Sequence, residues 1–63
     1  MPIINIDGPP IANLETRRSL VNELTAAAAR AYAMPEEKII VLIRENTPEQ
    51  VAVGGKLIAD LRR

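Results

Sequence analysis

Residues 39–43 read Ile-Ile-Val-Leu-Ile, five apolar residues in a row, and this stretch decides the fold. β-Branched aliphatic side chains favour extended backbone. An unbroken apolar run of this length is typical of a strand that is covered on both faces, whereas a strand with one wet face alternates with polar residues. We therefore predict a strand over residues 39–45 that is buried on both sides.

The segment before this strand is predicted to be a helix over residues 14–32. Asn13 is a favourable N-cap, and the segment has no Gly or Pro and contains a run of four alanines. Its apolar residues recur at helical spacing. Pro35 ends the helix, because proline lacks the backbone donor and disfavours helical geometry in the residue before it.

A second strand is predicted at residues 2–7, Pro-Ile-Ile-Asn-Ile-Asp. It is closed by Gly8-Pro9-Pro10, which cannot continue a ladder of hydrogen bonds. Strand, helix and strand in this order predict a parallel βαβ unit, an α/β fold. One helix covers only one face of such a sheet, so we expect another copy of the chain to cover the second face.

The remaining residues, 47–63, are expected to form a small hairpin and a short tail that clamps a neighbouring subunit. Gly54-Gly55 is the turn signal of this hairpin. The chain is thus predicted to be one domain over residues 1–63.

Length and composition point to self-assembly. A chain of 63 residues buries only about 60 % of the surface that its unfolded form exposes. Small domains compensate with disulfides, a metal or association, and a sequence without Cys or His cannot use disulfides and lacks the usual soft metal ligands. We expect a homo-oligomer that holds no metal.

Charge and hydropathy argue against other classes of protein. Eight basic residues balance eight acidic ones, and Tyr32 is the only aromatic residue, so no nucleic-acid partner is expected. No apolar run reaches the roughly 20 residues that span a bilayer. The start of the chain also lacks a basic region followed by a long apolar stretch. We expect a cytoplasmic protein without a membrane partner.

Pro2 is the candidate catalytic residue. Without His or Cys, acid–base chemistry must use a carboxylate, a lysine, the tyrosine or the chain terminus. Removal of Met1 would make that terminus a prolyl secondary amine. Desolvation disfavours the charged form of an amine, and a neutral amine is a suitable general base. A proline at the start of a strand is also ordinary, so this residue alone leaves the question open.

Several features occur together at this length: Met1-Pro2, the strand–helix–strand order, the proline after the helix, and Val53-Gly54-Gly55 in a terminal hairpin. Together they resemble the 4-oxalocrotonate tautomerase family over the whole chain. The resemblance implies a βαβ protomer of the tautomerase fold, dimers that form four-stranded sheets with the helices on one face, and a trimer of dimers. It also implies that the processed Pro2 is the general base of a cofactor-independent enol–keto tautomerase, acting on a small unsaturated 2-hydroxy or 2-oxo acid.

Three positions depart from the family's pattern. The best-known members have arginines where this chain has Ala12 and Ile40, and an aromatic residue where it has Val51. The resemblance implies that those arginines bind the carboxylates of a diacid and stabilise the developing enolate. We therefore expect weak activity on 2-hydroxymuconate, and we expect Ile40 and Val51 to be apolar walls of an inter-subunit pocket around Pro2.

Lys38 and Arg44 are the candidates to bind the substrate carboxylate in place of the missing arginines. Counted along the strand, both are expected on the face of Ile40, Lys38 about 7 Å away and Arg44 about 13 Å away in the other direction. A solvated surface charge is the alternative for each. Two other functions remain open: hydration or dehalogenation of an unsaturated acid on the same scaffold, and a non-catalytic oligomeric binding module.

Overall fold

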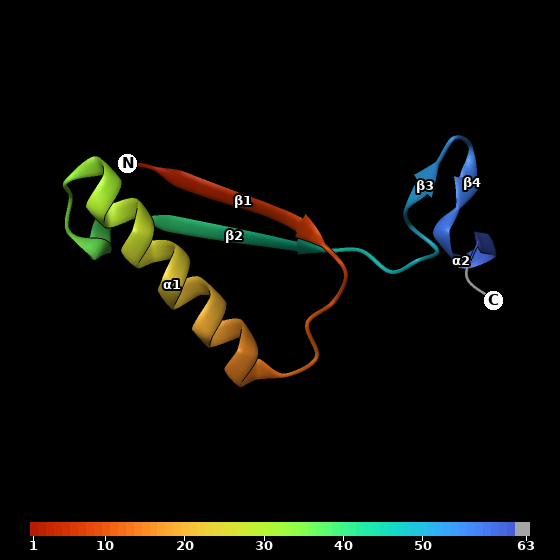
Figure 1. The fold of residues 1–63 in the computed structure, drawn as a ribbon, viewed down its shortest axis with the longest axis horizontal. Coiled ribbons are helices and arrows are strands. Elements are labelled where there is room, and N and C mark those ends of the chain that lie inside the picture. Colours follow the sequence, from red (N-terminus) through yellow and green to blue (C-terminus); the bar gives the residue numbers. More distant parts are fainter. Residues whose placement is uncertain (62–63) are drawn as a thin grey trace.

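The computed structural model describes residues 1–61 and contains one long helix and two small sheets (Figure 1). The last two residues of the expected tail, 62–63, lie outside the described part. The elements in chain order are β1 (Ile3–Gly8), α1 (Leu14–Tyr32), the 3₁₀ helix η1 (Glu36–Lys38), β2 (Ile40–Glu45), β3 (Ala52–Val53), β4 (Lys56–Leu57) and α2 (Ile58–Leu61).

The predicted α/β unit is confirmed: β1 and β2 pair in parallel and α1 connects them. The register runs from Ile3 opposite Ile40 to Gly8 opposite Glu45. β1 begins and ends one residue later than the strand predicted over 2–7. β2 begins one residue later than predicted, because residue 39 still belongs to the end of η1, where its amide donates to the carbonyl of Glu36 (3.0 Å).

The ends of α1 follow from local chemistry. Asn13 Oδ1 accepts hydrogen bonds from the amides of Glu15 (2.8 Å) and Thr16 (3.4 Å), which satisfies two of the unpaired donors of the first turn. At the other end Ala33 has left-handed geometry (φ 53°). The amide of Met34 donates back to the carbonyl of Ala29 (3.0 Å), as at many helix ends. This reversal returns the chain towards the start of β2.

The two faces of the β1–β2 sheet are not equivalent. Ile4 and Ile6 of β1, and their partners Val41 and Ile43, are half-buried on the face towards α1. The opposite face, called the open face here, carries six side chains from alternate positions of the two strands: Ile3, Asn5, Asp7, Ile40, Leu42 and Arg44. On it Ile3 is 54 % exposed and Leu42 is 49 % exposed. The open face is therefore not covered by any other part of residues 1–61.

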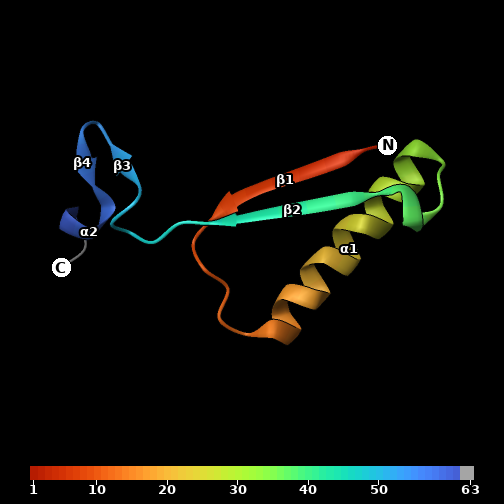
Figure 2. The same ribbon diagram turned by 180° about the vertical axis from the view of Figure 1, so that it is seen from behind.

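The hairpin lies apart from the sheet, beyond the carboxyl ends of β1 and β2 (Figures 1 and 2). Its turn is formed by Gly54 (φ 60°) and Gly55 (φ 82°), the left-handed pair that a tight two-residue hairpin needs. The radius of gyration is 15.1 Å, against about 11 Å for a compact chain of this length. A protruding hairpin of this kind has little of its own core to pack against.

Residues 1–61 contain neither a helix fit to span a membrane nor a cluster fit to hold a metal ion. No helix there is both long and apolar enough to cross a membrane. No cluster of three or more acidic, His or Cys side chains there is placed to hold a metal ion.

Candidate functional site

Pro2 lies at the amino end of the sheet, directly beside the start of β2. Its carbonyl oxygen accepts a hydrogen bond from the amide of Ile40 (3.0 Å), so the ladder begins at the proline itself. Pro2 is half-buried, and Met1 before it is exposed. The structure thus brings together two of the residues singled out in the sequence, Pro2 and Ile40.

Lys38 is placed differently from the prediction. It is the last residue of η1, and its amide donates to the carbonyl of Pro35 (3.1 Å), so its backbone is not extended. The alternation of a strand therefore does not put it on the face of Ile40, and that part of the prediction is wrong. The side chain is exposed, and within residues 1–61 it forms no ion pair.

Arg44 lies on the open face, as Ile40 does, and it is paired. Its guanidinium meets the carboxylate of Asp7, the residue opposite it in the register, through Nε–Oδ1 (2.9 Å) and Nη2–Oδ2 (3.1 Å). Both side chains are mostly exposed, so this ion pair contributes little to stability. A substrate carboxylate that binds Arg44 has to compete with Asp7.

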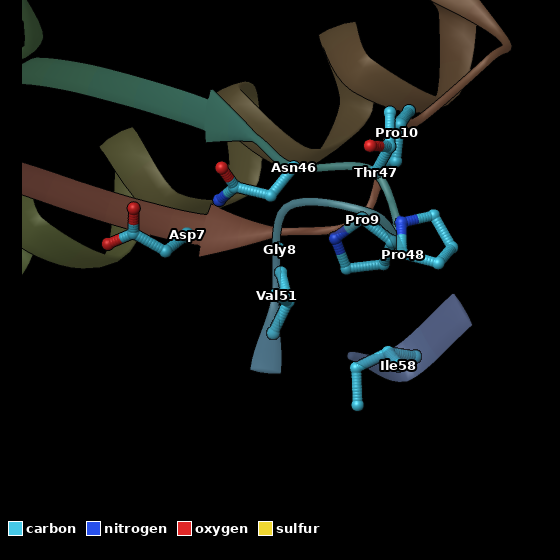
Figure 3. A pocket seen from close by; sticks show the side chains of 9 residues that line it. All are labelled: Asp7, Gly8, Pro9, Pro10, Asn46, Thr47, Pro48, Val51 and Ile58. Atoms are coloured by element: carbon cyan, nitrogen blue, oxygen red, sulfur yellow. The ribbon is translucent and has the colours of Figure 1, made fainter. Parts of the chain in front are cut away.

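A pocket of about 530 Å³ lies at the other end of the sheet, between the carboxyl ends of the strands and the hairpin (Figure 3). Asp7 and Asn46 lie towards its sheet side, and Val51 and Ile58 towards its hairpin side. The complete lining is Asp7, Gly8, Pro9, Pro10, Asn46, Thr47, Pro48, Val51 and Ile58. This lining is largely apolar and, in the described part of the chain, includes no basic side chain.

Val51 and Pro2 are not brought together within one chain. Val51 lines the pocket at the carboxyl end of the sheet, whereas Pro2 and Ile40 are at its amino end. The six residues of β1 lie between them and span about 20 Å at the usual rise of a strand. Walls supplied by both Ile40 and Val51 around one Pro2 therefore require more than one copy of the chain.

A polar cluster that was not predicted holds the loop between β1 and α1. Glu45 Oε2 accepts hydrogen bonds from the amide of Ile11 (2.9 Å) and from Arg17 Nη2 (2.7 Å). The same Nη2 donates to the carbonyl of Ile11 (2.6 Å). The partners are 28 and 34 residues apart in the chain, and no local sequence pattern signals such a contact.

Comparison with known proteins identifies the relatives of this chain. Residues 2–61 match the model of the tautomerase enzyme family. A 2-hydroxymuconate tautomerase of Bacillus subtilis is 38 % identical over 47 residues, which cover 75 % of this chain and 76 % of the relative. DmpI from Archaeoglobus fulgidus has a solved structure that superimposes with a TM-score of 0.83 at 42 % identity, covering 94 % of this chain and 100 % of the other. A heterohexamer 4-oxalocrotonate tautomerase from Chloroflexus aurantiacus gives a TM-score of 0.83 at 32 % identity, covering 98 % and 100 %.

Proposed function

The chain belongs to the tautomerase enzyme family, and on this premise we propose that it is a cofactor-independent enol–keto tautomerase in which Pro2, exposed by removal of Met1, is the general base. Its substrate is a small unsaturated 2-hydroxy or 2-oxo acid. The observation that carries this proposal is the position of Pro2 at the head of β1, tied to Ile40, where trimming of one exposed residue would free the ring nitrogen.

The chemistry moves one proton. The neutral ring nitrogen accepts the hydroxyl proton of the enol, and the electron pair of that O–H bond forms the carbonyl. The electron pair of the enol's carbon–carbon double bond, directly or relayed through a conjugated double bond, forms the new bond to the proton that the prolyl ammonium returns to carbon. An ordinary α-amino group has a pKa of about 7.7–8.0. Apolar surroundings such as Ile3 and Ile40 favour the neutral form that the reaction needs.

The functional unit is a homo-oligomer, with a dimer as the smallest unit and a trimer of dimers as the full assembly. The open face supports this, because Ile3 and Leu42 are exposed beside Ile40, and a contiguous exposed apolar patch marks an interaction surface. The separation of Pro2 from Val51 supports it as well, since the site needs a second copy. The heterohexamer relative from Chloroflexus aurantiacus shares the protomer fold.

A cation from Lys38 or Arg44 binds the substrate carboxylate. The described part of the pocket lining has no basic side chain, so the charge of the substrate needs a partner from outside it. Lys38 is exposed without an ion pair among the described residues, and Arg44 has to exchange Asp7 for the substrate. Activity on the dicarboxylate 2-hydroxymuconate is weak, because Ala12 and Ile40 supply no charge.

A panel of substrates tests this function. The purified protein is assayed with phenylenolpyruvate, with 2-hydroxymuconate and with a 3-haloacrylate. We expect ketonisation of phenylenolpyruvate, slower turnover of 2-hydroxymuconate, and no halide release. Halide release without ketonisation would assign the protein to hydration or dehalogenation instead. No turnover of any of the three by protein that has lost Met1 would favour a non-catalytic binding module.

A further inference from the structure

We propose that Glu45 and Arg17 are positioning residues, which fix the loop of residues 9–12 as one wall of the substrate site. This inference rests on the proposed function, in which Val51 of a second copy is a wall of the site around Pro2, so that the pocket Val51 shares with Pro9 and Pro10 belongs to that site. Neither Glu45 nor Arg17 is among the residues that line the pocket. Their influence therefore acts through the loop.

The backbone of the loop offers few points of attachment. Pro9 and Pro10 have no N–H, so the first amide after Gly8 that can donate is that of Ile11. Glu45 takes this donor at 2.9 Å, and Arg17 donates to the carbonyl of the same residue at 2.6 Å. Both backbone groups of Ile11 are thus held by one ion pair.

The other end of the loop is held by the sheet. The carbonyl of Gly8 accepts a hydrogen bond from the amide of Asn46 (2.8 Å), one residue beyond the end of β2. Pro9 and Pro10 lie between these two attachments, and each ring restricts its own φ. The wall is therefore fixed at both ends, and only the Ile11 end depends on side chains.

The pair is also more enclosed than a surface ion pair. The side chains of Arg17 and Glu45 are 38 % and 26 % exposed, and Arg17 Nε is buried without a hydrogen-bond partner within residues 1–61. The pair of Arg18 with Glu15 on the same helix is 63 % and 78 % exposed and spans three residues. Hydrogen bonds to ionised groups are the strong ones, and they are weakened less when water is partly excluded. The Arg18–Glu15 pair is therefore a matched control.

Steady-state kinetics with phenylenolpyruvate test the proposal on the assembled protein. Loss of one charge-assisted hydrogen bond to the wall should raise KM about tenfold in Glu45→Ala and in Arg17→Met. The kcat should stay within about twofold, because the base and the reacting atoms are untouched. Glu45→Gln keeps an acceptor oxygen and should lie between Glu45→Ala and the wild type. Arg18→Met should leave both constants unchanged.

Amide hydrogen exchange supplies a readout that does not depend on activity. The amide of Ile11 should exchange faster in Glu45→Ala than in the wild type. In Arg18→Met it should exchange at the wild-type rate. Sedimentation should show the same assembly for all three proteins. An unchanged KM in Glu45→Ala with an active wild type would overturn the positioning role, as would an unchanged exchange rate at Ile11. If the wild type is inactive while Ile11 still responds, the proposed function is refuted, and the substrate role of this wall falls with it.

Discussion

The amide of Ile40 donates a 3.0 Å hydrogen bond to the carbonyl of Pro2, which joins the candidate base to the start of the second strand. The contact fixes the residue that would become the first of the chain on removal of Met1. It also sets Ile40 next to Pro2, at a position where the family's best-known members have an arginine. The backbone ladder thus sets the position of Pro2, and the apolar residue Ile40 lies beside it.

Replacement of the proline tests the assignment of the base. Pro2→Ala replaces the rigid secondary amine by a freely rotating primary amine, and it should lower kcat/KM for phenylenolpyruvate by about 10²-fold, the lower end of the usual contribution of a general base. The ladder bond uses the carbonyl of residue 2, so the fold should be unchanged. Pro35→Ala, at the turn before η1, is the matched control and should retain the wild-type rate. Equal rates in Pro2→Ala and the wild type would refute the assignment.

An arginine introduced beside Pro2 should increase activity on a dicarboxylate substrate. Ile40→Arg should raise kcat for 2-hydroxymuconate by about 10²-fold, the effect of one donor aimed at developing negative charge. Asn22→Arg puts the same side chain on the exposed side of α1, away from Pro2, and should give no such gain. The comparison is made by following the loss of the dienol on variants whose assembly has been checked by sedimentation. A gain in both variants, or in neither, would contradict this account of Ile40.

Assembly should depend on the open face. Leu42→Glu places a charge among Ile3 and Ile40, and burying it between copies without a partner is costly. Analytical ultracentrifugation should show smaller species for this variant at concentrations where the wild type is fully assembled. Asn22→Glu, on the exposed side of α1, should sediment as the wild type does. Normal assembly of Leu42→Glu would mean that another surface joins the copies.

The stability of the protein should depend on the left-handed glycines of the hairpin turn. Gly55 has φ 82°, and a side chain there is strained whatever the space around it. Gly55→Ala should therefore lower the free energy of unfolding by about 1–2 kcal/mol, measured by urea titration at one fixed protein concentration. Gly8→Ala is the control, because its φ is outside the left-handed region and an added Cβ meets nothing within 4 Å. A loss of equal size at Gly8 would show that the backbone angle is not the cause.

The βαβ unit could be predicted because its signals are local. Asn13 caps the helix, and the apolar run from residue 39 marks a strand that one helix cannot cover on both faces. Strand alternation does not predict the face of Lys38, because this residue lies one position before the predicted strand, in Glu36–Lys38, which forms a turn of 3₁₀ helix. An exposed 3₁₀ turn before a strand has no strong sequence signal, and the alternation argument fails one residue outside the strand.

The candidate site was harder to predict than the fold. The bond between Glu45 and Ile11 joins residues that are 34 apart, and it depends on how α1 lies at the end of the sheet. The pocket between the sheet and the hairpin likewise depends on where Pro48 and Ile58 are brought after the chain leaves β2. The pattern of residue types along the chain does not indicate which of these distant residues meet in space.

The proposed reaction requires a free, uncharged ring nitrogen at Pro2. The most direct test is a ¹⁵N NMR titration of the assembled protein labelled with ¹⁵N-proline, with the Pro2 resonance identified by its absence in Pro2→Ala. We expect an amine resonance that is already in its neutral form at pH 7.5. A nitrogen that stays protonated well above neutrality, or an amide shift that shows Met1 still attached, would contradict it.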